Sequence, residues 1–95
     1  MQQPCIYILT NKKNGTLYIG VTSNLPQRIE QHRSKLVVGF TAKYDLHVLV
    51  YFESYPTITE AIIREKRLKK WNRQWKINLI EKLNPKWEDI SYLLA

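Results

Sequence analysis

Two tyrosines each lie near the middle of a short apolar run, and a helix with basic side chains follows directly after the second run. The tyrosines are Tyr7 and Tyr18, and the helix carries Arg28 and His32 one turn apart. Phenol and imidazole groups can donate, accept and relay protons, and a guanidinium binds phosphate oxygens well. Tyrosine is also a common strand residue that simply packs. Either two phenols are aimed at one point together with the residues that follow, or the tyrosines only fill a core.

Polar side chains also interrupt two apolar helical stripes. The first stripe follows the spacing i, i+4, i+7, i+11 and comprises Leu25, Ile29, His32 and Leu36. The second has the inward spacing of a helix and comprises Ile58, Ala61, Ile62, Glu65 and Leu68. Glu65 therefore stands where an apolar residue is expected, and an unpaired buried carboxylate costs roughly several kcal/mol.

Two arrangements would compensate the charge of Glu65. One is an internal ion pair with Arg28 or His32. The other is a shallow site in which Glu65 holds a divalent cation and Arg28 binds a phosphate. Periodicity alone does not separate them. The tyrosines favour the second arrangement, because pairing of the two apolar runs as strands would bring Tyr7 and Tyr18 close together.

Length and composition predict one small domain. The chain has 95 residues, of which 44% are apolar, and we expect a single domain over 1–95 with its core at about 4–83. One cysteine, Cys5, suits a reducing compartment. No apolar run is long enough to span a bilayer, and the first residues lack the pattern of an export signal. We therefore expect a cytoplasmic monomer that does not bind membranes.

The charge balance predicts a polyanionic partner. The formal net charge is +7, and seven cations fall within thirteen residues, interleaved with Trp71 and Trp75. These cations are Arg64, Lys66, Arg67, Lys69, Lys70, Arg73 and Lys76. A charge run is often only a solvated face, but its single sign and its adjacent aromatic residues favour nucleic acid over a membrane or an acidic protein.

The pattern of apolar and turn residues predicts an α+β domain. Strands are expected at 5–10, 16–21 and 46–53, and helices at about 24–36, 57–70 and 73–83. Asn24 and Thr57 are expected to cap the first two helices, and Asn84 a short terminal helix over about 85–94. The order is β-β-α-β-α-α.

The tripeptides CIY at 5–7 and YIG at 18–20, followed by TSNLPQRIEQH, resemble the signature of the GIY-YIG nuclease family. The similarity continues over almost the whole chain, through FTAKY (40–44), LVYFE (49–53), AIIREKRLKKW (61–71) and NPKWEDIS (84–91). The sequence is most similar to the small single-domain YhbQ-like predicted endonucleases of this family. It also resembles the N-terminal nuclease module of the excision-repair UvrC family.

The resemblance implies a three-stranded antiparallel sheet flanked by helices and metal-dependent hydrolysis of DNA with Mg²⁺ or Mn²⁺. Tyr7 and Tyr18 match the two signature tyrosines, one of which would deprotonate or orient the attacking water with a lowered phenol pKa. Arg28 matches an arginine that would hold phosphate oxygens. His32 would relay the proton or hold a tyrosine in place, and Glu65 matches the glutamate that binds the metal. Which tyrosine is the base stays open.

Some positions depart from the family pattern or leave its assignment open. Cys5 replaces the first glycine of the signature, whereas Gly20 matches the second and would let the backbone pass close to the site. The family often has a late asparagine near the site, for which Asn72, Asn78 and Asn84 compete. We choose Asn78, which is expected on the inward flank of its helix, because Asn84 precedes a proline and is expected to act as a cap.

These features predict a DNA endonuclease, structure-selective or weakly sequence-specific, that acts in DNA repair or recombination. The alternative is a non-catalytic nucleic-acid-binding module of the same fold, and RNA remains an alternative ligand. A third interpretation, a basic structural protein with an internal Glu–Arg pair, leaves the two tyrosines unexplained. Tyr44 either contacts substrate or packs before the third strand. The residues expected to contact DNA are Lys12, Lys13, Lys43, Arg64, Arg67, Lys69, Lys70 and Arg73.

Overall fold

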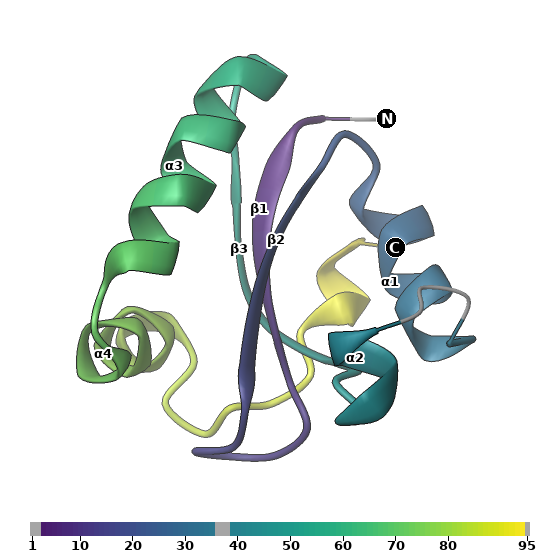
Figure 1. The fold of residues 1–95 in the computed structure, drawn as a ribbon, viewed down its shortest axis with the longest axis vertical. Coiled ribbons are helices and arrows are strands. Elements are labelled where there is room, and N and C mark those ends of the chain that lie inside the picture. The colour runs from purple at the N-terminus through teal and green to yellow at the C-terminus, as the bar shows by residue number, and fades with distance from the viewer. Residues whose placement is uncertain (1–2, 36–38, 95) are drawn as a thin grey trace.

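The centre of the protein is an antiparallel sheet with the strand order β2-β1-β3. We describe residues 3–35 and 39–94 of a computed structural model. Strand β1 (Cys5–Thr10) pairs with β2 (Leu17–Thr22) on one side and with β3 (Val48–Ser54) on the other. β2 is therefore an edge strand of the sheet (Figure 1).

Helices cover both faces of this sheet. α1 (Leu25–Arg33) and α2 (Phe40–Lys43) lie on one side together with a short 3-10 helix, η1 (Ser91–Leu94). α3 (Ile58–Lys70) and α4 (Arg73–Leu83) lie on the other side (Figure 1). The prediction of an α+β domain with a three-stranded antiparallel sheet is confirmed.

The alternation of side chains along β1 creates two apolar cores. Ile6 and Ile8 belong to the core beneath α3 and α4. Tyr7 and Leu9 point the other way, into the core beneath α1. All six residues of β1 are buried, which is expected of a central strand that is covered on both faces. Tyr7, one of the two signature tyrosines, thus lies on the central strand of the sheet.

Local capping chemistry sets the start of the longer helices. The side chain of Asn24 accepts a hydrogen bond from the backbone of Gln27, and that of Thr57 accepts one from Glu60. Helices α3 and α4 occupy 58–70 and 73–83, as the sequence predicts. The described part of α1 ends at Arg33, and Leu36 lies outside the described residues.

The apolar stripe of α3 is narrower than its spacing predicts. Ala61 and Leu68 are fully buried, but Ile58 and Ile62 are 40% and 36% exposed, so their expected inward position is wrong. The helix lies over β2 and β1, and Ala61 and Leu68 are its buried residues (Figure 1). Glu65 lies on the half-buried flank, with 13% of its side chain exposed.

The expected terminal helix over about 85–94 is wrong, because only Ser91–Leu94 form a short 3-10 helix. Asn84 is the C-cap of α4 instead of an N-cap. Its buried amide donates hydrogen bonds to the carbonyls of Val50 (3.1 Å) and Glu88 (2.9 Å) and accepts one from the Glu88 backbone (3.0 Å). These bonds hold the terminal segment in an extended path across β3.

We expect Asn84→Ala to lower the free energy of unfolding by about 2 to 3 kcal/mol, because it leaves buried backbone groups without partners. Chemical denaturation followed by circular dichroism measures this change. Asn78→Ala is the matched control, since that amide is exposed on the same helix and should change stability by less than about 0.5 kcal/mol. Equal stability of the two variants would contradict a holding role for Asn84.

Candidate active site

Two neighbouring strands bring the signature tyrosines together. Tyr7 lies opposite Gly20 across the β1–β2 pair, and Tyr18 lies opposite Leu9, two residues along the same face. The centroids of the two tyrosine rings are 6.2 Å apart. A Cβ atom at position 20 would collide with the end of the Tyr7 ring. Gly20 therefore makes room for a tyrosine side chain, whereas we expected it to serve the path of the backbone.

A chain of hydrogen bonds connects Tyr7 to the first helix. Arg28 Nε donates to the Tyr7 hydroxyl at 3.3 Å, and this hydroxyl lies 3.0 Å from His32 Nε2. His32 Nδ1 lies 3.0 Å from the hydroxyl of Thr41. The Tyr7 oxygen accepts from Arg28 and can still donate its own proton to His32 Nε2. In the tautomer that accepts this proton, His32 carries its ring proton on Nδ1, which faces Thr41.

The surroundings of these groups keep both of them uncharged. Burial raises the pKa of the Tyr7 phenol to about 12, although Arg28 opposes the shift. The expected lowering of a phenol pKa by a metal and by neighbouring cations is thus not produced at Tyr7 by Arg28 alone. Burial, assisted by the positive charge of Arg28, lowers the pKa of His32 below its ordinary 6.5. Tyr7 therefore enters any reaction as a neutral donor, and His32 as a neutral acceptor.

The pKa of His32 makes the stability of the protein dependent on pH. Below about pH 6.5 His32 becomes protonated in the unfolded chain, whereas in the folded chain its lowered pKa keeps it neutral. The free energy of unfolding therefore decreases as the pH falls through this range. We expect a lower unfolding temperature at about pH 5 than at about pH 7.5, and a smaller difference in His32→Gln. Thermal scans measure the unfolding temperature at both pH values. His47→Gln is the control, because the His47 side chain is 45% exposed. An unchanged pH dependence in His32→Gln would contradict the assignment.

Aromatic residues from α2 extend the site outward. The rings of Tyr18 and Phe40 are stacked with centroids 6.4 Å apart, and Tyr44 follows at 4.8 Å from Phe40. The Lys43 ammonium lies 5.4 Å from the Tyr44 ring centroid. Sequence reasoning singled out Lys43 and Tyr44 but missed Phe40 and the histidine partner Thr41. Both residues belong to the segment FTAKY (40–44), which sequence comparison had singled out. Sequence alone does not show which side chains of this segment face Tyr18 and His32.

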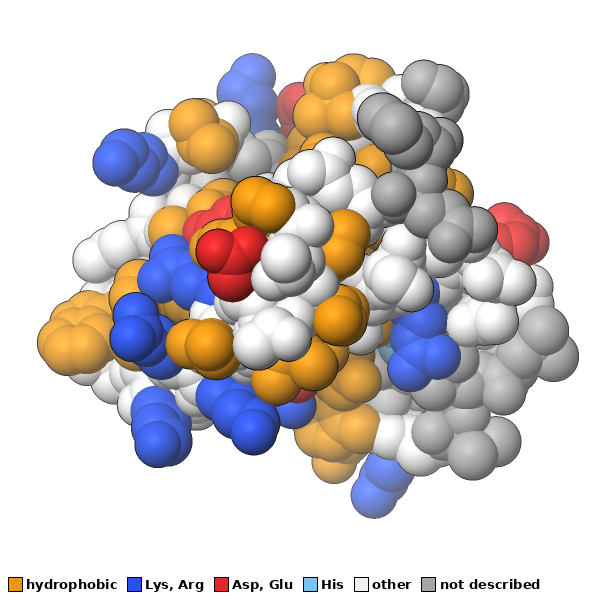
Figure 2. Space-filling view, turned by 90° about the horizontal axis from the view of Figure 1, so that it is seen from above, with side chains coloured by type: hydrophobic (Ala, Val, Ile, Leu, Met, Phe, Trp, Pro, Cys, Tyr) orange, Lys and Arg blue, Asp and Glu red, His pale blue; other side chains and the backbone are white. Residues whose placement is uncertain are grey.

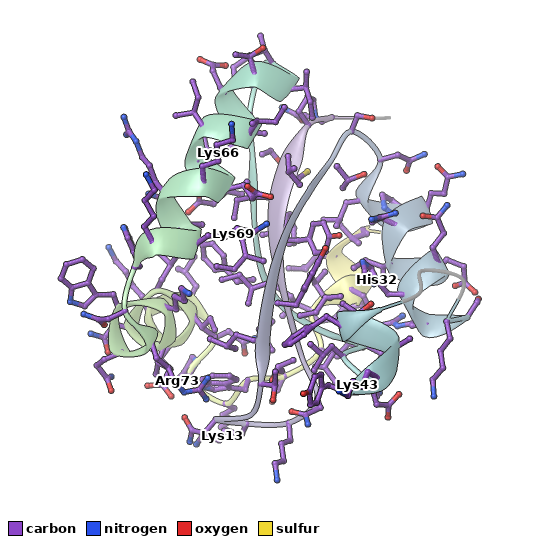
Figure 3. The ribbon with its side chains drawn as sticks, in the orientation of Figure 1. Lys13, His32, Lys43, Lys66, Lys69 and Arg73 are labelled. Atoms are coloured by element: carbon purple, nitrogen blue, oxygen red, sulfur yellow. The ribbon has the colours of Figure 1, made fainter. Side chains whose placement is uncertain are left out.

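Glu65 lies apart from this group, on the other side of the sheet. Its carboxylate forms an ion pair with Lys69 one turn along α3, at 3.0 Å. Among residues 3–35 and 39–94 it pairs with neither Arg28 nor His32, so the internal ion pair considered from the sequence is not formed. α3 packs on one face of the sheet at β2, and the tyrosine side chains project from the other face. Figure 3 shows Lys69 and His32 on either side of β2.

The donor set fits a weakly held hard cation. The described residues contain no group of three or more His, Cys, Asp or Glu side chains that would form a complete metal cage. Mg²⁺ commonly needs only one or two carboxylates and completes its shell with water and substrate phosphates. Glu65, half-buried and charged, is a carboxylate of this kind. Its carboxylate pairs with the Lys69 ammonium.

None of the three competing asparagines contacts the tyrosine group. Asn78 is exposed on α4 and accepts a hydrogen bond from Gln74, so its expected inward position is wrong. Asn72 caps the start of α4 by accepting from the backbone of Trp75. Asn84 holds the terminal segment. Trp75, from which the inward flank was inferred, is itself exposed, so Asn78 three residues later lies on an exposed flank of α4.

Three of the residues expected to bind DNA have partners within the protein. Arg64 is bound to Glu53 by a pair of hydrogen bonds of 2.9 and 3.1 Å, so its charge is neutralised within the protein. Arg73 donates to the carbonyls of Asn14 and Gly15 and holds the β1–β2 turn against α4. Lys69 pairs with Glu65. The exposed cations among the expected residues are Lys12, Lys13, Lys43, Arg67, Lys69, Lys70 and Arg73.

Basic side chains surround the β2 edge. Figure 3 shows Lys66 and Lys69 along α3, Lys13 and Arg73 at the end of the hairpin, and Lys43 on α2. In Figure 2 the Lys and Arg side chains gather on the side of the molecule that carries α3, between apolar groups.

None of the described helices is long and apolar enough to cross a bilayer.

Comparison with known proteins decides the family. The family model of the GIY-YIG catalytic domain matches residues 3–78. The chain belongs to the GIY-YIG family. The matched range contains both tyrosines, Arg28, His32 and Glu65. A nuclease family of this kind has nucleic acid as its substrate.

Two relatives and one solved structure match most of the chain. A UPF0213 protein of Staphylococcus haemolyticus is 36% identical over 81 residues, which covers 85% of this chain and 98% of the relative. A UPF0213 protein of Clostridium perfringens is 37% identical over 84 residues, covering 88% and 89%. The solution structure of UPF0213 protein BH0048 from Bacillus halodurans has a TM-score of 0.57 at 27% identity and covers 96% of both chains.

Proposed function

We propose that this GIY-YIG protein is a divalent-metal-dependent DNA endonuclease that is structure-selective or weakly sequence-specific and serves DNA repair or recombination. The observation that carries the proposal is the hydrogen-bonded series from Arg28 through Tyr7 to His32 beside the second tyrosine. A structural core has no need of a buried phenol placed between a guanidinium and a neutral imidazole. The basic rim around β2 supports a polyanionic substrate.

The residues of the site divide the work of phosphodiester cleavage. Arg28 uses Nε for Tyr7 and Nη1 for Gln31, which leaves Nη2 to bind a non-bridging phosphate oxygen. The Tyr7 oxygen takes a proton from the attacking water as its own proton passes to His32 Nε2. This relay lets a phenol with a raised pKa act without first becoming a phenolate. Tyr18 bounds the site and orients the water.

Glu65 provides the carboxylate for the cation. A bound Mg²⁺ or Mn²⁺ would neutralise charge on the phosphate and stabilise the leaving oxygen. Lys69 pairs with Glu65 and would be released from it if Glu65 held a cation, which would leave its ammonium to contact the DNA backbone at the β2 edge. A DNA strand that crosses β2 would contact the groups on both faces of the sheet at once.

Cleavage of a panel of labelled DNAs tests the proposal. The panel contains single-stranded, duplex, flap and branched substrates, with Mg²⁺, with Mn²⁺ and with a chelator. We expect products that depend on the metal and are richest on one branched or flap structure. Binding without products on any substrate would favour the non-catalytic module, whose support is the small size of the domain and its wide basic surface.

Lys70 offers a test of the basic rim without touching the chemistry. Lys70→Ala should weaken DNA binding and lower the slope of log affinity against log salt by about 1, with an unchanged single-turnover rate at saturating DNA. Lys70 is preferable to Lys69 because the latter contacts Glu65. Lys35→Ala, on the far end of α1 and next to Asp45, is the control. Loss of the saturated rate in Lys70→Ala would contradict the assignment.

A further inference from the structure

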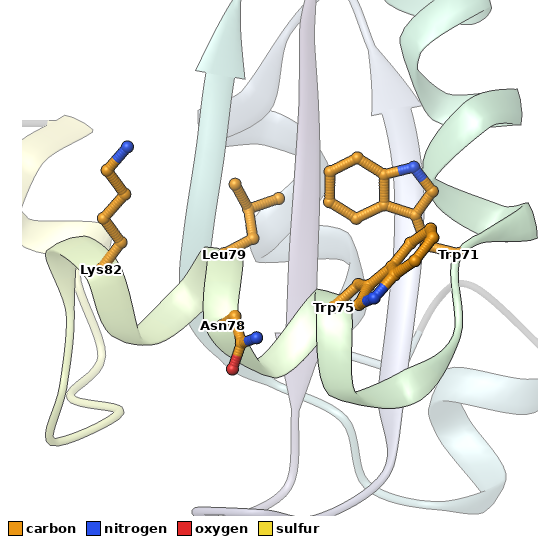
Figure 4. Close-up of a pocket in the computed structure, with 5 residues that line it drawn as sticks. All are labelled: Trp71, Trp75, Asn78, Leu79 and Lys82. Atoms are coloured by element: carbon orange, nitrogen blue, oxygen red, sulfur yellow. The ribbon is translucent and has the colours of Figure 1, made fainter.

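A groove on the outer side of α4 contains two tryptophans that the proposed chemistry does not use. Its volume is about 390 Å³, near the lower end of the roughly 300–1,000 Å³ usual for ligand sites. The residues that line it are Trp71, Trp75, Asn78, Leu79 and Lys82 (Figure 4). An apolar floor, an exposed indole, an amide and an ammonium thus meet in one place.

Trp75 is the most unusual member of this groove. Its side chain is 55% exposed, whereas Trp87 is 4% exposed and belongs to the core. Trp71 meets Trp75 edge to face, with centroids 5.9 Å apart, and is itself held by the Arg64 guanidinium at 5.1 Å. The Trp75 ring is therefore supported from one side and leaves its other surface to solvent, as a stacking platform requires.

The charge around the groove fits a polyanion. Between residues 64 and 83 the sequence has eight Lys and Arg but only two Glu. Both carboxylates are engaged, since Glu65 pairs with Lys69 and Glu81 accepts a hydrogen bond from the Trp87 indole at 2.8 Å. A neutral protein surface would match the indole alone and an acidic one the cations alone, whereas a nucleic acid strand presents a flat base for the indole beside a phosphate for the cations.

We propose that this groove binds an unpaired nucleobase of a single-stranded DNA segment. The base stacks on Trp75, the Asn78 amide meets the edge of the base, and Lys82 meets the adjacent phosphate. Bases within a duplex are stacked on each other and cannot enter, so the groove selects substrates with a single-stranded arm. The inference rests on the proposed function and names the structural feature of DNA that the nuclease would prefer.

Binding of a labelled oligothymidine of about eight nucleotides tests the groove directly, in the presence of a chelator so that no cleavage occurs. Trp75→Ala should weaken this binding roughly tenfold, in line with the ~1–3 kcal/mol of one base–aromatic stack, and leave duplex affinity within about twofold. Trp75→Phe should retain most of the affinity because it keeps an aromatic face. Leu83→Ala is the matched control, an apolar side chain that is 77% exposed on the same helix but outside the groove.

The outcomes separate this inference from the proposed function. If Trp75→Ala and Leu83→Ala bind the oligothymidine equally well, the groove inference is overturned even when the protein cleaves DNA. An equal loss for duplex and single strand also overturns it, because the groove then makes no distinction. If the oligothymidine binds through Trp75 but nothing on the panel is cleaved, the groove stands and the nuclease proposal fails.

Discussion

Replacing Tyr7 by phenylalanine is expected to lower the single-turnover rate of DNA cleavage by about 10²- to 10⁴-fold, the usual contribution of a positioned proton donor and acceptor. The variant keeps the ring that fills the core beside Gly20 and removes only the hydroxyl between Arg28 and His32. DNA affinity should stay nearly unchanged, because the phosphate contact is assigned to Arg28 and the basic rim is intact. A rapid-mixing assay with enzyme in excess over labelled DNA measures the rate.

The control for this experiment is Tyr92→Phe, which removes a phenol that is 68% exposed on η1 and away from β2. Near-ultraviolet circular dichroism and the unfolding temperature show whether Tyr7→Phe keeps its fold. If a folded Tyr7→Phe cleaves DNA at the wild-type rate, the phenol takes no part in the chemistry. Tyr18 would then be the residue to test next.

Replacing Glu65 by glutamine is expected to abolish metal-dependent cleavage, with a loss of more than about 100-fold. Loss of a partner that only orients a metal ligand already costs about 10- to 100-fold, so loss of the ligand itself should cost more. Glutamine has nearly the same shape and removes the negative charge that holds the cation. It also frees Lys69, so DNA affinity should stay equal or rise. Cleavage at increasing Mn²⁺ concentrations and DNA binding in chelator measure the two effects.

Glu88→Gln is the matched control, because this carboxylate is exposed on the terminal segment and its backbone alone is bound by Asn84. It should cleave DNA at the wild-type rate. Full cleavage by Glu65→Gln would show that the metal lies elsewhere or that the activity does not need it. Loss of cleavage together with loss of DNA binding would instead indicate a change in the surface of α3.

Local patterns determined most of the architecture. Alternating apolar residues and the turn at 11–15 predict the hairpin, and its Asn14 does adopt a positive φ of 58°. The side-chain caps at Asn24 and Thr57 predict where α1 and α3 begin. These features depend on contacts within a few residues of sequence, which is why the sequence alone predicts them. The same short spacing places Arg28 and His32 one turn apart.

Only the tertiary structure decided which groups meet. Glu65 interrupts its stripe as predicted, but α3 crosses the sheet from the face opposite Tyr7, so its partner is Lys69 instead of Arg28. Arg64 and Arg73 look like free cations in sequence, yet they bind Glu53 and the hairpin turn across long sequence separations. The pKa of Tyr7 rises because its hydroxyl is buried under α1, which no local pattern indicates. Sequence thus determined the residue types and their helical spacing, whereas partners, burial and charge state depended on packing between distant segments.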